Sequence, residues 1–157
     1  MDRGLVAALE SAAVRSTVTA RVVNEIPPGT EIPTEIERNA YFIATESLVN
    51  ASKHSTATDI EIRVGLRQVA TAPELPEETW MDVVVTDNGR GGAKAVEGHG
   101  IAGLEERLRG LGGTLEVLSP VGGPTIISAH LPVMLAAAPA APAASAPPAD
   151  DAATPSL

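Results

Sequence analysis

One long segment with helical periodicity, followed at once by two segments with strand periodicity, limits the folds open to this chain. Residues 33–55, PTEIERNAYFIATESLVNASKHS, carry apolar side chains at the spacing of an amphipathic helix, and Thr34 with Glu37 fits a capping box at its start. Residues 58–69, TDIEIRVGLRQV, alternate between polar and apolar, and residues 80–87, WMDVVVTD, form a short apolar strand that ends on an acid. This pattern indicates a sheet with a helix packed on it.

The other segments extend the pattern on both sides. Residues 2–16 and 101–111 have helical spacing, and residues 17–23, 114–119 and 125–133 read as strands. In the last helix, Leu104, Leu108 and Leu111 point inward, with a Glu105–Arg109 pair outside. The order α-β-α-β-β-α-β-β predicts a two-layer α/β sandwich. Its sheet is mixed, mostly antiparallel and of about five strands, with three helices on one face.

Composition limits the class of protein. The chain has no cysteine, which excludes disulfides and thiolate metal sites and suits a reducing cytosol. A formal net charge of −9 argues against a nucleic-acid partner. No apolar run is long enough to span a membrane, so we expect a cytoplasmic domain without membrane contact. Residues 1–133 form the predicted domain, and the Ala/Pro-rich residues 134–157 are expected to be a disordered tail.

A polar stripe runs along the long predicted helix. Glu46 and Asn50 are four residues apart, and Lys53 and His54 follow three and four residues later, so all four share one face. An amide oxygen suits Mg²⁺ without repelling a triphosphate, and Lys53 could meet a phosphate as a point charge. The alternative is the solvated face of a surface helix.

The second cluster follows the buried strand, in VVVTDNGRGGA. Asp87 ends the strand, and Gly89 and Gly91 allow a close approach of the backbone to a ligand. A carboxylate in a small pocket would accept a hydrogen bond from the exocyclic amine of adenine, whereas guanine presents a carbonyl there. The alternative is a plain hairpin turn, which would need an alternating strand after it.

The third cluster is a glycine pattern before the last helix. Gly98, Gly100 and Gly103 match G-x-G-x-x-G, and the free amide groups at the start of the helix favour a phosphate. No strand leads directly into Gly98, so the pattern does not fit a dinucleotide-binding unit. A glycine-rich lid over phosphates and a simple flexible loop both remain open.

The three motifs together resemble a known superfamily. E-x-x-x-N on a helix, D-x-G-x-G after a strand and G-x-G-x-x-G before a helix resemble, in this order, the Bergerat-type ATPases. The stretches YFIATESLVNASKHSTATDIEI, VVVTDNGRGGA and GHGIAGLEERLRGLGGTLEV are similar to the ATP-binding catalytic domain of sensor histidine kinases of the nitrate-sensor and degradation-sensor type. The likeness runs from Gly4 to Pro132 and implies the Bergerat fold.

The resemblance implies ATP and Mg²⁺ as cofactors and a role for each site residue. Asn50 would bind magnesium, Asp87 would accept a hydrogen bond from the adenine amine, and Thr125 would support Asp87. The adenine pocket would be lined by Gly89 and Gly91, and the phosphate lid would contain Gly98, Gly100 and Gly103. The phosphates or ribose would lie near Lys53 and His54. Glu46 is the general base in some superfamily members. In this kinase type an acid beside the phospho-accepting histidine is the usual candidate, so the catalytic role of Glu46 stays open.

The resemblance also implies partners. Such a domain passes the γ-phosphate of ATP to a histidine on a dimerisation domain, and the kinase then serves a response regulator with a helix-turn-helix output domain. It would be the cytosolic part of a membrane-bound sensor or a cytoplasmic protein. Because His54, His99 and His130 do not resemble an acceptor site, we expect an excised or truncated catalytic domain without autophosphorylation of its own.

Two other functions compete with this one. An anti-sigma-factor-type protein-serine kinase shares the nucleotide motifs, although GIAGLEERLRGLGG fits sensor kinases better. A non-catalytic module that binds nucleotide or a partner protein is the second rival. It is favoured by Pro124, because the family usually has glycine directly before the threonine that Thr125 matches.

Overall fold

The computed structural model describes residues 4–54, 56–70, 72–92 and 100–133, so the tail predicted for residues 134–157 lies outside the described residues. Eight elements follow in the predicted order α-β-α-β-β-α-β-β. Their bounds are α1 Gly4–Val14, β1 Thr19–Glu25, α2 Thr34–His54, β2 Asp59–Val69, β3 Glu78–Asp87, α3 Ile101–Gly110, β4 Thr114–Leu118 and β5 Thr125–Val133.

The strands form one mixed sheet of five strands in the order β1-β2-β3-β5-β4. β1 pairs with β2 in parallel, and the pairs β2–β3, β3–β5 and β4–β5 are antiparallel. The connection from β1 to β2 must return the chain to its starting end, and α2 makes that crossover. The predicted mixed, mostly antiparallel sheet is therefore confirmed.

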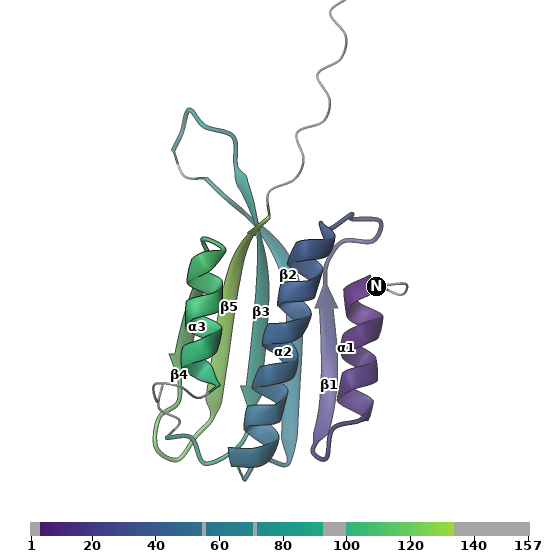
Figure 1. Ribbon diagram of the computed structural model, residues 1–157, viewed down its shortest axis with the longest axis vertical. Helices are drawn as coiled ribbons and strands as arrows, with labels where there is room; N and C mark the ends of the chain where they lie inside the picture. The colour runs from purple at the N-terminus through teal and green to yellow at the C-terminus, as the bar shows by residue number, and fades with distance from the viewer. Residues whose placement is uncertain (1–3, 55, 71, 93–99, 134–157) are drawn as a thin grey trace, which may run out of the picture.

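All three helices lie on one face of the sheet, as predicted (Figure 1). The core between the layers is built from the inward rows of the strands and the apolar stripes of the helices. Leu104 and Leu108 of α3 are buried in it, as predicted, and Leu111, just after α3, is half-buried against it. Glu105 and Arg109 pair outside at 2.8 Å, as predicted. Within the described ranges, no helix combines the length and the apolar character needed to cross a bilayer.

The start of α2 differs in one detail from the expected capping box. The carboxylate of Glu37 accepts a hydrogen bond from the backbone amide of Leu5 at 3.2 Å. Leu5 lies in the first turn of α1, where backbone amides lack partners within the helix. Glu37 therefore ties α2 to α1, a contact that local sequence spacing does not reveal.

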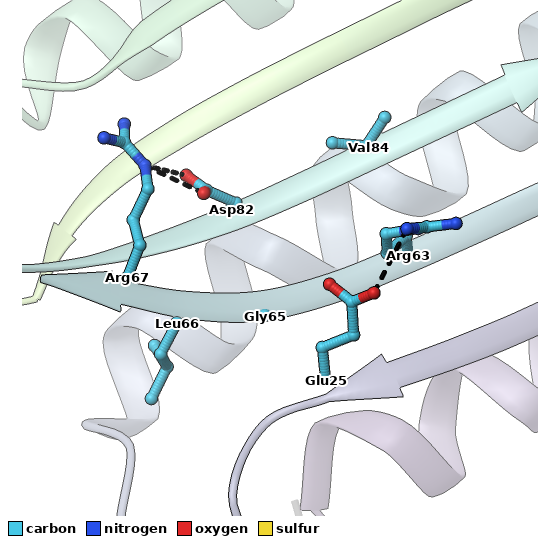
Figure 2. Close-up of a pocket in the computed structure, with 7 residues that line it drawn as sticks. All are labelled: Glu25, Arg63, Gly65, Leu66, Arg67, Asp82 and Val84. Atoms are coloured by element: carbon cyan, nitrogen blue, oxygen red, sulfur yellow. Dashed lines mark hydrogen bonds and ion pairs between the residues drawn. The ribbon is translucent and has the colours of Figure 1, made fainter.

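The opposite face of the sheet carries charged side chains instead of helices. A shallow hollow of about 280 Å³ lies over Gly65, flanked by the pairs Arg63–Glu25 and Arg67–Asp82 (Figure 2). His130 of β5 also contacts Asp82, at 2.6 Å. Because each arginine that lines this hollow has a carboxylate partner, the surface has no excess of one charge there.

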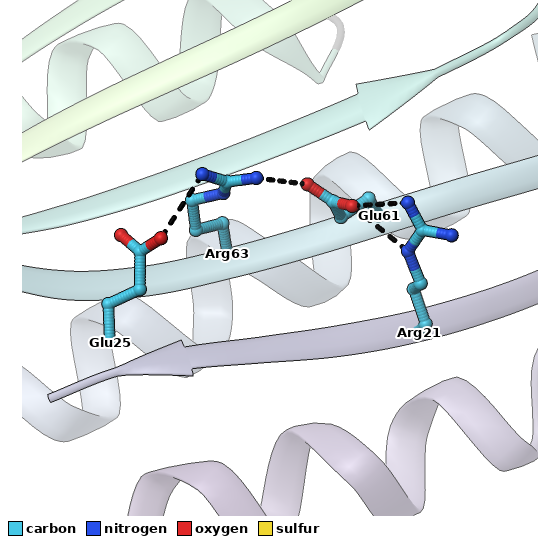
Figure 3. Close-up of polar contacts among 4 residues, drawn as sticks. All are labelled: Arg21, Glu25, Glu61 and Arg63. Carbon is cyan, nitrogen blue, oxygen red and sulfur yellow. Dashed lines mark hydrogen bonds and ion pairs between the residues drawn. The ribbon is translucent and has the colours of Figure 1, made fainter.

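A chain of ion pairs crosses the same face from β1 to β2 (Figure 3). Glu61 contacts Arg21 at 2.6 Å and Arg63 at 2.9 Å, and Arg63 reaches Glu25 at 3.1 Å. Hydrogen bonds from Arg21 and Arg63 lower the pKa of the Glu61 carboxyl below its usual value of 4.5. The two strands are thus joined by charge as well as by their backbone ladder.

Replacing Glu61 should destabilise the fold in a pH-dependent way. A folded-state pKa that is lowered gives stability that is present above the usual value of 4.5 and is lost as the pH falls through the folded pKa. Glu61→Gln should therefore lower the free energy of unfolding at pH 7 by less than about 1 kcal/mol, since the pairs are partly solvated. The difference should shrink at low pH in urea titrations. Glu116→Gln, on the same face of β4, is the control, and an equal effect of both variants would contradict this account.

Candidate functional site

The predicted site residues come from elements that end or begin at the same end of the sheet. The last turns of α2, the end of β3 and the start of α3 lie together at the lower end of the molecule (Figure 1). The start of β5 lies there too, because Thr125 is the register partner of Asp87. The fold therefore brings together motifs that are far apart in the sequence.

Asp87 is buried because alternate residues of β3 face the core and Asp87, the last residue of the strand, is one of them. Met81, Val83 and Val85 face the core, and Asp87 follows at the same spacing of two, with 4% of its surface exposed. Its Oδ1 accepts a hydrogen bond from the amide of Gly89 at 2.8 Å. A buried carboxylate needs donors, and at this position it can accept from a ligand as well.

Thr125 lies across from Asp87 at the first position of β5. Its side chain is 7% exposed, and its hydroxyl is 2.8 Å from the hydroxyl of Ser119. Pro124 does not displace it, since the ladder between β3 and β5 includes the pair Asp87–Thr125. Proline in place of the usual glycine at position 124 is thus compatible with pairing at Thr125, while support of Asp87 by Thr125 stays a prediction.

The glycine loop after β3 interlocks with the turn between β4 and β5. The amide of Gly92 donates to the carbonyl of Ser119 at 3.0 Å, and the amide of Gly122 donates to the carbonyl of Arg90 at 2.8 Å. Gly91 has φ +62°, and a Cβ there would lie 1.9 Å from the carbonyl oxygen of Pro120. Gly91 is therefore required by the packing of two loops, in addition to any role in the predicted adenine pocket.

Asn88 was not among the predicted site residues, although it fixes the glycine loop to the segment between α2 and β2. Its side-chain Oδ1 accepts from the backbone amides of Thr58 and Asp59 at 2.9 and 3.0 Å, and its backbone amide donates to the carbonyl of Asp59 at 3.2 Å. Asn88 thus ties the end of β3 to the segment that follows α2. The turn signal Asn-Gly indicated a turn here, but the partner lies 30 residues away.

The polar stripe of α2 lies in the same region, next to the start of α3. Asn50 is half-buried, and within the described part of the chain its Nδ2 is buried without a hydrogen-bond partner. A Cβ on Gly100 would lie 2.9 Å from that Nδ2 and 3.0 Å from Oδ1. Glycine at position 100 therefore lets the backbone lie directly against the Asn50 amide.

The remaining predicted residues differ in exposure. Glu46 is half-buried, Lys53 is exposed, and Gly103 is exposed on α3 with nothing within 4 Å of the position of a Cβ. The side chain of His54 and all of Gly98 lie outside the described residues. The hollow of Figure 2 lies on the opposite face of the sheet and includes none of these residues.

The interlocked loops give a prediction on stability. Gly91→Ala should destabilise the protein by more than about 2 kcal/mol, because the new methyl group meets a backbone carbonyl and the φ of +62° is unfavourable. Gly92→Ala has the same φ problem, at +76°, but nothing within 4 Å, so it should cost only about 1 kcal/mol. Urea unfolding of both variants measures the difference, and equal costs would show that the loop contact does not matter.

Comparison with known proteins supplies relatives in sequence. No protein-family model matches the chain. It is 36% identical over 102 residues to the methanol utilization control sensor protein MoxY of Paracoccus denitrificans, covering 60% of this chain and 21% of that protein. It is 33% identical over 104 residues to the nitrate/nitrite sensor protein NarQ of Escherichia coli, covering 64% and 17%. The chain thus spans about a fifth of the length of these curated relatives.

Comparison with solved structures shows which proteins share the fold of this chain. The ATP-binding domain of PrrB from Mycobacterium tuberculosis superposes with a TM-score of 0.57 at 18% identity, over 83% of this chain and 94% of that one. The histidine kinase domain of a blue-light-activated kinase from Erythrobacter litoralis gives a TM-score of 0.51 at 21% identity, over 82% and 57%. The chain therefore has the fold of the ATP-binding domains of histidine kinases, and the curated proteins that it resembles in sequence are sensor proteins.

Proposed function

We propose that this chain is the ATP-binding catalytic domain of a sensor histidine kinase, which binds Mg-ATP and donates the γ-phosphate to a histidine on a dimerisation segment. The observation that carries the proposal is the buried carboxylate of Asp87 at the end of β3. It lies at the end of the sheet where α2 presents Asn50 and where Gly100 directly precedes α3. An adenine acceptor, a metal ligand and a phosphate-binding helix start are then all supplied from one region.

Asp87 gives the site a reason to prefer adenine. A carboxylate oxygen accepts a hydrogen bond from the exocyclic amine of adenine, whereas the carbonyl of guanine would place two acceptors against each other. Because the side chain is only 4% exposed, water could not easily relieve that conflict. Gly89, which is buried beside it and donates to its Oδ1, would hold the carboxylate in one orientation.

Asn50 fits the role of the magnesium ligand. One end of its amide is buried without a partner among the described residues, and the two ends exchange by rotation of the side chain. Mg²⁺ favours a few hard oxygen ligands and leaves other positions to phosphate and water. A bound Mg²⁺ would supply charge neutralisation for the phosphates. The cofactor assignment rests on this orphaned amide.

Phosphoryl transfer depends mainly on positioning and on neutralising charge, so this chain needs little further chemistry. Gly100 and Gly103 would let the start of α3 approach the phosphates, and Lys53 would add a point charge. Glu46, half-buried one turn before Asn50, is the candidate to orient a water or accept a proton.

The partners proposed with this function are the histidine-bearing dimerisation domain and a response regulator with a helix-turn-helix output domain. The proposed location is the cytoplasm.

Titration with nucleotide tests the proposal directly. A non-hydrolysable ATP analogue with magnesium should bind, and a GTP analogue should bind much more weakly. Asp87→Asn should lower the affinity for the ATP analogue by at least about tenfold, since an amide donor would face the adenine amine. Asn50→Ala should remove the dependence on magnesium. Calorimetry on folded proteins measures all of these, and a folded wild-type protein that binds no nucleotide would instead support a partner-binding module.

Substitutions at two glycines of α3 distinguish an effect on nucleotide affinity from an effect on stability. Gly103→Ala should raise stability by up to about 1 kcal/mol, because alanine favours the helix and its methyl group meets nothing within 4 Å. The same methyl group should obstruct the approach of phosphates and lower the affinity for the ATP analogue. Gly110→Ala, with equally open space at the far end of α3, is the matched control and should leave affinity unchanged. Unchanged affinity in Gly103→Ala would place the phosphates elsewhere.

A further inference from the structure

Arg107 connects α3 to α2 at the end of α3 that lies away from the site. Its Nε–H donates a hydrogen bond to Oδ1 of Asn39 at 2.9 Å, across 68 residues of sequence. Its guanidinium also lies over the ring of Phe42, 4.4 Å from the ring centroid. A planar guanidinium can make both contacts at once, which a lysine ammonium cannot reproduce.

The α2 residues that receive Arg107 are themselves held in place. Asn39 is 4% exposed, and its Nδ2 donates to the carbonyl of Glu35 at 2.8 Å within α2. Its Oδ1 is therefore directed outward from a fixed amide, and Arg107 satisfies a buried acceptor. Phe42 is 37% exposed, and the guanidinium lies against its ring.

Asn39, Phe42 and Asn50 lie on one stripe of α2, since their spacing of three and eight residues keeps them on one face. α3 meets this stripe at two points. Gly100 lies against Asn50 at one end, and Arg107 lies against Asn39 and Phe42 at the other. Along α3 the two contacts are about 10 Å apart. Two contacts at this separation fix the inclination of α3 against α2 as well as its distance.

We propose that Arg107 is a positioning residue for the nucleotide site: it holds α3 at the spacing from α2 that keeps Gly100 against Asn50. This inference rests on the proposed function and adds a residue to it that touches neither nucleotide nor metal. Leu104 and Leu108 anchor α3 to the core, but their apolar contacts are not directional. The hydrogen bond and the stacked ring supply the direction that core packing lacks.

The part of the site that depends on Arg107 can be separated from the part that does not. Asp87 lies on β3, whose position is set by its ladders to β2 and β5. Loss of Arg107 should therefore weaken contacts to the phosphates and magnesium and spare contacts to adenine. A general loss of folded structure would weaken both.

The test compares Arg107→Ala with Arg109→Ala. Both remove one arginine from the last turn of α3, but among the described residues the ion pair of Arg109 stays within that helix, with Glu105. Arg107→Ala should weaken binding of the non-hydrolysable ATP analogue with magnesium about tenfold, and should leave adenosine binding unchanged within about twofold. Arg109→Ala should change neither. Arg107→Lys, which keeps the charge but not the planar group, should resemble Arg107→Ala.

Hydrogen exchange in the absence of nucleotide gives an independent readout. The amide of Leu104, which donates to the carbonyl of Gly100 at 3.0 Å, should exchange faster in Arg107→Ala than in the wild-type protein or in Arg109→Ala. If Arg107→Ala does not fold, Arg107→Lys supplies the comparison. Equal affinity and equal exchange in the Arg107 and Arg109 variants would overturn the inference. A wild-type protein that binds no nucleotide would overturn the proposed function instead, and the exchange result would still decide whether Arg107 positions α3.

Discussion

The core-facing row of β3 is the constraint on which the rest of the site depends. Alternation along the strand buries Met81, Val83 and Val85, and the same alternation carries Asp87 into the edge of the core. A carboxylate at this position must be surrounded by donors and small residues. Gly89 supplies a backbone amide at 2.8 Å, and Thr125 lies opposite in the neighbouring strand. The central strand of the sheet thus supplies both core residues and the proposed contact to adenine.

The loops around this carboxylate are held by contacts that leave little space. Gly91 meets the carbonyl of Pro120, Gly123 meets the carbonyl of Gly89, and Asn88 ties the strand end to the segment after α2. A nucleotide pocket benefits from such loops, because a fixed site loses less entropy on binding. On the helix side, α2 and α3 meet at Asn50 and again at Arg107. The proposed site therefore lies between elements that contact one another at several points.

Periodicity alone predicted the elements and the class of sheet, since helices and strands with one buried face carry their spacing in the sequence. The burial of Asp87 followed from the same rule. The contacts of Glu37 with α1, Asn88 with the loop after α2 and Arg107 with α2 could not be predicted, because their partners are 32, 30 and 68 residues away and depend on how the elements pack. Gly91 was expected to line a pocket, and its tight contact with another loop was likewise invisible in local sequence.

Mapping of backbone amide chemical shifts during titration with magnesium and a non-hydrolysable ATP analogue tests the central claim most directly. The claim is that nucleotide binds where α2, β3 and α3 meet. Shifts should then concentrate at Asn50, Gly89 and Gly100 and leave the open face of the sheet around Gly65 unchanged. Shifts confined to the hollow over Gly65, or no shifts at saturating nucleotide, would contradict it.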